Sequence, residues 1–161
     1  MKRLFLIVAA ACAAIVSAAA LVVSSGAQQS GPPTGTLELV SLDRETRFKF
    51  VDNPPRRRES AGDLFMINAR LRDGSNRRAG RLHASFAQTQ PPPRGVAQGS
   101  ATFILRNGQI IVGGPIVERG RNDRTDTFAV VGGSGAYTAA RGTMVTTETR
   151  RRIRFVFTFA G

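Results

Sequence analysis

Few side chains in this 161-residue chain could carry out covalent or metal chemistry. The only cysteine is Cys12 and the only histidine is His83. A single thiol excludes a disulfide framework and a zinc site of several thiolates, and a single imidazole excludes a metal site of several histidines. We therefore expect no metal and no cofactor, so any reaction would depend on charged side chains and on confinement of the reactant.

Residues 132–135 (GGSG) could be mistaken for two functional motifs. They do not form a dinucleotide-binding fingerprint, because the third glycine is absent and no long helical period follows. They do not form a nucleophile elbow, because Ala136 stands where glycine is required and only His83 could act as a base. Adjacent glycines allow a tight reversal of the chain. We therefore predict a structural turn here, with Tyr137 packed over it and its hydroxyl at a cavity mouth or in water.

Three acidic residues, Glu38, Asp43 and Asp126, are placed on predicted strands or at their ends. In an apolar cavity that excludes water, a carboxylate stabilises a positive charge that develops during a reaction. Glu38 is the candidate for this role, and a solvent-facing position or an ion pair with a neighbouring arginine is its alternative. Asp43 is expected to close a turn, and Asp126 either faces the mouth of such a cavity or caps the glycine-rich loop.

The elements that would position these residues are short β-strands. Alternation of apolar and polar residues is clearest near the end of the chain, where Ile153, Phe155, Phe157 and Phe159 share one face. Similar patterns occur at residues 37–42, 48–50, 64–71, 80–89, 101–105, 109–113, 127–131 and 143–149. Between two of them, Asn107-Gly108 predicts a hairpin with a type I′ turn. Eight or nine short strands without a long helical period predict an all-β antiparallel barrel or sandwich.

The first 27 residues are predicted to be a secretory signal peptide. A basic start, Met1-Lys2-Arg3, precedes an apolar run over residues 4–23, and small residues follow at Ser25 and Ala27. About 20 apolar residues can also span a bilayer, so an uncleaved anchor is the alternative. Residues 28–35 have the composition of a linker. The remaining domain, residues 36–161, is expected to be secreted, periplasmic or associated with the cell envelope, and membrane-anchored if the signal is not cleaved.

The chain is strongly basic. Lys and Arg number 23 against 11 Asp and Glu, a net charge of +12, and 21 of the 23 bases are arginine. Arginine clusters occur at residues 56–58, 77–78, 119–121 and 150–152. They could attract an anionic surface, polymer or ligand, or they could simply form a solvated face. Nucleic acid is not an expected partner, because export is predicted and no aromatic residue interleaves with the basic runs.

Residues 127–142 (TFAVVGGSGAYTAARG) resemble the VVGGTG-x-F-x-x-ARG segment of dirigent proteins and the VTGGSG-x-F-x-x-x-x-G segment of plant allene oxide cyclases. Glu38, Asp43 and Arg44 reproduce the E-x-x-x-x-D-R pattern of the first cyclase strand, and residues 155–159 resemble the last strand. The resemblance covers about residues 36–161. It implies an eight-stranded antiparallel β-barrel with an apolar lumen that binds a small apolar ligand, in a homo-oligomer such as a trimer or a dimer.

The resemblance also implies roles for individual residues. Glu38 matches the cyclase carboxylate that assists ionisation of the allene oxide, and Arg141 matches the arginine of the dirigent ARG motif, so these two are the candidate catalytic residues. Asp43, Phe86, Asp126 and Tyr137 are the candidate ligand-binding residues. Where the cyclases have their remaining Asn, Ser, Pro and Cys residues, this chain has Val40, Thr46, Arg47, Ala69 and Phe86, so a plant-type allene oxide cyclase is not expected.

Two functions remain open from the sequence. The first is a secreted barrel that binds a small apolar molecule and guides its cyclisation, isomerisation or stereoselective coupling without a cofactor. The second is a non-catalytic ligand carrier, or an envelope-associated protein that binds through its basic surface.

Overall fold

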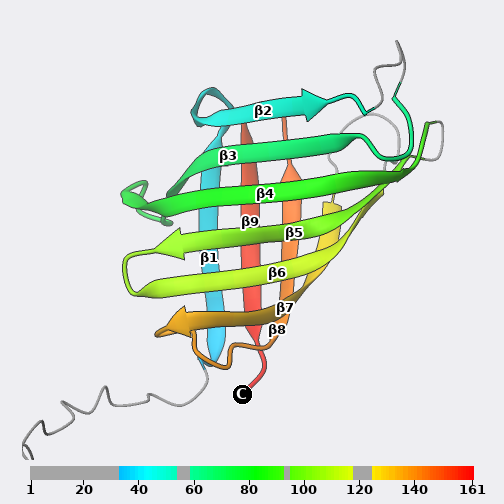
Figure 1. Cartoon of the computed structure of the whole chain (residues 1–161). Coiled ribbons are helices and arrows are strands. Elements are labelled where there is room, and N and C mark those ends of the chain that lie inside the picture. Colours follow the sequence, from blue (N-terminus) through cyan, green and yellow to red (C-terminus); the bar gives the residue numbers. More distant parts are fainter. Residues whose placement is uncertain (1–32, 54–58, 93–94, 118–124) are drawn as a thin grey trace, which may run out of the picture.

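The computed structural model describes residues 33–53, 59–92, 95–117 and 125–161 (Figure 1). The predicted signal peptide, most of the predicted linker and the arginine clusters at 56–58 and 119–121 lie outside these residues. In the part of the chain that is described, no helix has the length and apolar character needed to span a membrane.

Nine antiparallel strands and one turn of 3-10 helix make up the described fold. The strands are β1 (Gly35–Leu42), β2 (Thr46–Val51), β3 (Leu64–Arg72), β4 (Arg78–Gln90), β5 (Val96–Leu105), β6 (Gly108–Val117), β7 (Thr125–Gly135), β8 (Gly142–Glu148) and β9 (Arg152–Phe159), and the 3-10 turn η1 covers Asp43–Glu45. From β2 to β9, each strand pairs with the next in the sequence, and β9 pairs with β1.

These strands close into an eight-stranded barrel. β1 and β2 act as one strand bent at η1: β1 pairs with β9 along its whole length, and β2 pairs with β3. A contact between Val40 of β1 and Arg72 of β3 completes the circle. In Figure 1, β2 to β6 run across the front, and β1, β9 and β8 cross behind them. The predicted all-β, eight-stranded antiparallel barrel is therefore confirmed.

Alternation along the strands decides which side chains fill the barrel. On β9, Phe155, Phe157 and Phe159 are buried, whereas Arg154 and Thr158 on the other face are exposed. The ring of Phe103 on β5 meets the edges of Phe155 and Phe157, with ring centroids 5.1 and 4.9 Å apart. Such edge-to-face contacts suit the charge distribution of aromatic rings. Leu39, Leu71, Ile110 and Val112 complete a packed core at the end of the barrel where β1 begins.

The hairpin predicted between β5 and β6 is present, but its turn is not of type I′. Leu105 pairs with Gly108, so the two turn residues are Arg106 and Asn107. A type I′ turn requires a positive φ at both central residues. Here the positive φ, +145°, belongs to Gly108, the first residue of β6. Gly108 also pairs with Gly135 of β7, and a side chain at this position would overlap the backbone oxygen of Ser134.

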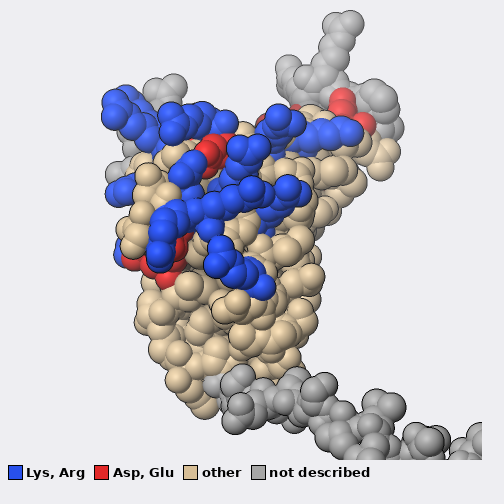
Figure 2. Space-filling view, turned by 90° about the vertical axis from the view of Figure 1, so that its left-hand side faces the viewer, with Lys and Arg blue, Asp and Glu red and all other residues tan. Residues whose placement is uncertain are grey.

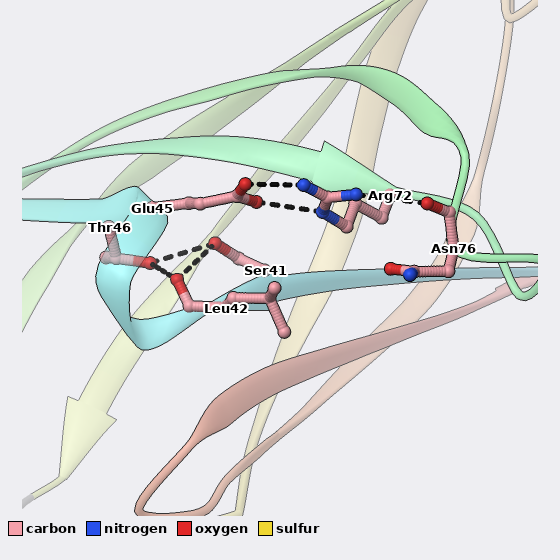
Figure 3. Close-up of polar contacts among 6 residues, drawn as sticks. All are labelled: Ser41, Leu42, Glu45, Thr46, Arg72 and Asn76. Atoms are coloured by element: carbon pink, nitrogen blue, oxygen red, sulfur yellow. Dashed lines mark hydrogen bonds and ion pairs between the residues drawn. The ribbon is translucent and has the colours of Figure 1, made fainter.

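The bend between β1 and β2 is held by polar contacts (Figure 3). The Thr46 hydroxyl donates a hydrogen bond to the backbone oxygen of Leu42 (3.0 Å) and lies 2.8 Å from the hydroxyl of the buried Ser41. Glu45 accepts two hydrogen bonds from the guanidinium of Arg72, at 2.9 and 2.5 Å. Arg72 also donates to the backbone oxygen of Asn76 (3.1 Å). These contacts attach the bend to β3, the strand that pairs with β2.

The Glu45–Arg72 pair makes part of the stability of the protein depend on pH. The hydrogen bonds from Arg72 hold the pKa of Glu45 below its ordinary value of 4.5. A lowered pKa means that the pair stabilises the fold fully above about pH 5 and that this contribution is lost as the pH falls through the lowered pKa. We expect Glu45→Gln to lower the Tm by a few degrees at neutral pH and by progressively less in acid. A difference in Tm that stays constant from neutral pH into acid would contradict this assignment.

Candidate functional site

The barrel interior is filled at one end and open at the other. A cavity of about 190 Å³ occupies the half of the barrel where β3, β5, β7 and β9 begin. Its polar lining residues are Gln88, Asp126, Thr146 and Glu148, and its apolar lining residues are Phe48, Phe65, Ile67, Leu82, Ala84, Phe86, Ala97, Ala101, Phe103, Ile116, Phe128, Met144, Ile153 and Phe155. Most of these side chains are apolar, so the cavity favours an apolar occupant.

Small side chains create this space. Ala84 of β4 and Ala101 of β5 lie directly opposite each other in the barrel wall, and both face inward. Ala97, on the same β5 strand, is a third small residue that lines the cavity. Larger residues at these positions would extend the packed core into the cavity, so the alanines keep the open half of the barrel hollow.

The cavity reaches the surface where β2, β8 and β9 meet. Phe48 on β2 is 60% exposed although it lines the cavity. Glu148 at the end of β8 is exposed, and it pairs with the half-buried Ile153 at the start of β9. These residues form the rim of a mouth through which a ligand can enter.

Polar groups are concentrated near this mouth. Asp126 of β7 lies opposite Thr146 of β8. One carboxylate oxygen of Asp126 accepts a hydrogen bond from the backbone N–H of Val117 (3.3 Å), and the Thr146 hydroxyl donates to the backbone oxygen of Asp126 (3.3 Å). The buried Gln88 uses its side-chain amide to donate to the backbone oxygen of Gln90 (2.7 Å). With Glu148, Asp126 gives an apolar cavity an acidic mouth.

Two of the six residues singled out from the sequence line this cavity, namely Phe86 and Asp126. Glu38 lies on the outer face of β1, because its neighbours Leu37 and Leu39 pack against or within the core. Its carboxylate accepts two hydrogen bonds from Arg154, at 2.7 and 2.6 Å, and these hold the pKa of Glu38 below its ordinary value. This placement matches the ion-pair alternative for Glu38 rather than a lumenal carboxylate.

The remaining three candidates also lie away from the cavity. Asp43 is exposed in η1, where its backbone N–H donates to the backbone oxygen of Arg151 (3.0 Å). Arg141 is exposed just before β8, and its guanidinium donates to the backbone oxygen of Ala140 (2.7 Å). Tyr137 is half-buried at the closed end, 6.1 Å from the ring of Phe159, and burial raises the pKa of its hydroxyl. The structure therefore does not bring these residues together with Phe86 and Asp126.

Sequence reasoning missed three polar lining residues, Gln88, Thr146 and Glu148. A signal for them was present in the alternation. Gln88 continues the inward series of Leu82, Ala84 and Phe86, and Thr146 and Glu148 continue the series that begins with Met144. The lone His83 lies on the outer face, where its Nδ1 contacts the side-chain oxygen of Asn68 (2.6 Å). Among the described residues, no three His, Cys, Asp or Glu side chains lie together as metal ligands would.

Comparison with models of known protein families identifies the family to which this barrel belongs. The family model of dirigent-like proteins matches residues 36–157. The chain belongs to the dirigent-like protein family. The match covers the dirigent-like barrel from β1 almost to the end of β9, which confirms the resemblance seen in the sequence. None of the curated proteins matches the chain significantly.

Several solved structures share this dirigent-like barrel. A pyocyanin demethylase matches with a TM-score of 0.65 and 18% identity, covering 78% of this chain and 100% of its own. The pterocarpan synthase dirigent protein PsPTS1 matches with a TM-score of 0.58 and 18% identity over 79% of this chain and 96% of its own. The Diels–Alderase AbmU from Streptomyces koyangensis has a TM-score of 0.60 and 16% identity, covering 78% of this chain and 64% of its own. At these identities the similarity shows a common fold.

Proposed function

We propose that this dirigent-like barrel binds a small, largely apolar molecule in its cavity and guides the cyclisation or coupling of that molecule. The observation that carries the proposal is the open cavity of about 190 Å³ with aromatic walls and an acidic mouth. An apolar cavity of roughly 150 Å³ in a protein core can hold benzene. The cavity of the barrel therefore suits one aromatic ring with substituents, and the rest of a longer molecule would project through the mouth.

Confinement is the main catalytic effect that such a cavity can supply. The walls hold a flexible reactant in one folded conformation, which reduces the entropy lost on reaching the transition state. They also exclude water that would capture a reactive intermediate. The similarity to a pterocarpan synthase and to a Diels–Alderase supports a reaction that closes a ring or joins two partners. We further propose that residues 1–27 direct export, so that the barrel acts outside the cytoplasm.

Asp126 is the residue that we propose for electrostatic assistance, in place of Glu38. Its carboxylate lies at the edge of the apolar cavity, where negative charge stabilises a cation more strongly than in water. Val117 fixes one of the carboxylate oxygens through its backbone N–H. A positive charge that develops on a bound ring during cyclisation would therefore be stabilised at the mouth.

This role is tested by replacing Asp126 with asparagine, which keeps an oxygen that can accept the hydrogen bond from Val117. Wild type and Asp126→Asn are titrated with the neutral fluorophore prodan, in competition with 1-methylnaphthalene and with 1-naphthylmethylammonium. We expect the affinity for the neutral naphthalene to stay the same and that for the ammonium to fall about tenfold, equivalent to about 1.4 kcal/mol.

Glu148→Gln, which removes the exposed rim charge, is the matched control and should have a smaller effect. An equal loss of affinity for the neutral and the cationic naphthalene in Asp126→Asn would contradict the electrostatic role. If the wild type binds none of prodan, 1-methylnaphthalene and 1-naphthylmethylammonium, the proposal that the cavity binds a ligand is contradicted.

A non-catalytic carrier is the second candidate function. The observation that favours it is the position of Glu38 and Arg141, the two candidate catalytic residues from the sequence, away from the cavity. If both the wild type and Asp126→Asn bind apolar ligands and neither converts them into products, the carrier function is supported.

A further inference from the structure

Positive charge is gathered on one face of the barrel. Figure 2 shows Lys and Arg side chains collected over the upper part of the face that lies at the left of Figure 1, with few acidic side chains among them. We call five of the exposed arginines on this side the basic band: Arg47 on β2, Arg70 on β3, Arg78 and Arg81 on β4, and Arg106 between β5 and β6.

The register of the strands brings these arginines close together. Arg70 lies directly opposite Arg81 across the β3–β4 pair. Both point outward, because Ala69, Leu71 and Leu82 occupy the inward positions. Like charges that face each other across a sheet destabilise it. An anion bound between the two guanidinium groups would remove this repulsion, so the free protein is prepared electrostatically for an anionic partner.

Three acidic residues on this side of the barrel are already paired with other arginines. Glu45 is paired with Arg72, and Asp73 is paired with Arg77 at 3.1 Å. Glu38, on the neighbouring β1, is paired with Arg154 at 2.6 Å. None of the five arginines of the basic band forms an ion pair with a described residue. Their guanidinium groups therefore remain available to a partner.

A surface groove lies within the basic band. Arg78, Arg81 and Arg106 line it together with His83, and its volume is about 480 Å³. Gly80 and Ile104 form part of the floor, and a side chain on Gly80 would overlap the backbone oxygen of Ile104. A second hollow of about 270 Å³ continues past Arg78 and Arg106 to Asp73 and Arg77. The two hollows form an elongated, positively lined path rather than a single closed pocket.

We propose that the basic band binds a linear polymer that carries regularly spaced carboxylate groups, such as an acidic polysaccharide. Guanidinium groups bind carboxylates through two parallel hydrogen bonds. The same side of the barrel already contains two such pairs, Arg72 with Glu45 and Arg154 with Glu38. This interaction is separate from ligand binding in the cavity and does not depend on it.

The shape of the band favours a chain over other anionic partners. Its arginines project from three adjacent strands of a closed barrel and from a turn, so they point in different directions around a curved wall. A flexible chain can follow this curvature, whereas a flat bilayer would meet only a few of the guanidinium groups at once. Single-stranded nucleic acid is bound with the help of exposed aromatic rings. The residues that line the two hollows include no Phe, Tyr or Trp.

The proposal is tested with oligogalacturonate as the carboxylated chain. Its binding to the full-length protein is compared with that of neutral dextran, of phosphatidylcholine vesicles containing phosphatidylserine, and of a thymidine oligonucleotide. We expect oligogalacturonate to bind most tightly, with an affinity that falls as salt is added. The double variant Arg81→Gln/Arg106→Gln should weaken this binding about tenfold or more, because two charge-assisted contacts are lost.

Arg150→Gln/Arg151→Gln is the matched control, since it removes the same charge from the β8–β9 connection, away from the groove. It should weaken binding much less than the variant in the groove. Prodan binding should be unchanged in both double variants, which separates this proposal from ligand binding in the cavity. Tighter binding to the vesicles or to the oligonucleotide, or equal weakening by the two double variants, would overturn the proposal.

Discussion

Ala101→Phe is expected to abolish ligand binding while leaving the barrel folded. Ala101 is 5% exposed and lines the cavity opposite Ala84. The added phenyl ring would occupy the space that a ligand needs. Because the ring enters an existing cavity, its cost to stability should lie at or below the low end of the roughly 1–3 kcal/mol that overpacking causes in a filled core. We expect the Kd for prodan to rise about 100-fold or more, equivalent to about 2.7 kcal/mol.

The control is Ala129→Phe, which places the same ring on the outer face of β7. Ala129 is exposed, between the buried Phe128 and Val130. Its replacement should leave prodan binding unchanged and should leave the far-UV circular dichroism of the barrel intact. Equal binding by Ala101→Phe and wild type would mean that the probe binds elsewhere on the protein, and the cavity would then lose its assignment as the ligand site.

Gly142→Ala is expected to cause a large loss of stability. Gly142 begins β8, pairs with Val130 and Phe159, and has a φ of +138°. A β-carbon there would overlap the backbone oxygen of Thr158 in the neighbouring strand. The unfavourable φ and the forced separation of β8 from β9 should together cost about 2–4 kcal/mol. Thermal unfolding should therefore show a Tm about 8–15 °C below that of wild type.

Gly113→Ala is the matched control because it adds the same methyl group to β6. The nearest atoms to a β-carbon at Gly113 lie 3.8 Å away, which is an ordinary contact, and no positive φ is required. We expect its stability to change by less than about 1 kcal/mol, in either direction. A similar loss in both variants would show that the position of Gly142 in the backbone is not the cause.

The sequence allowed the barrel to be predicted because its inward residues alternate so regularly. The phenylalanines of β9 identify their buried face without any structural information. β1 is more difficult, since Val40 and Leu42 on the outer face are as apolar as Leu37 and Leu39 on the inner one. The alternation places Glu38 on the face of β1 that is opposite to the face of Leu39, whereas the family motif suggests a lumenal role for Glu38. In the structure Glu38 lies on the outer face, as the alternation predicts.

The family resemblance implied an apolar lumen, but the position and the lining of the cavity could not be predicted, because they depend on register. Ala84 and Ala101 leave a hollow only because strand pairing places them opposite each other, and the sequence does not specify that pairing. Likewise, Glu45 and Arg72 are 27 positions apart in the sequence, and their side chains meet only after the barrel has closed. Phe86 was singled out because it stands at a position that is functional in the resembling cyclases, and Asp126 because it precedes the strand that leads to the glycine-rich loop. Gln88, Thr146 and Glu148 were missed because polar residues at inward positions do not stand out in a hydrophobic pattern.

The bent strand at the cavity mouth has a consequence for the range of ligands. Among the described residues, β2 is hydrogen-bonded to β3 and to no strand on its other side, and β1 meets β3 at the single pair Val40–Arg72. Opening the wall here breaks few backbone hydrogen bonds, so it costs much less than global unfolding. Phe48 and the partly exposed Phe50 would move with β2 and uncover the cavity. We therefore expect the upper limit on ligand size to be set by how far β2 moves outward rather than by the volume of the closed barrel.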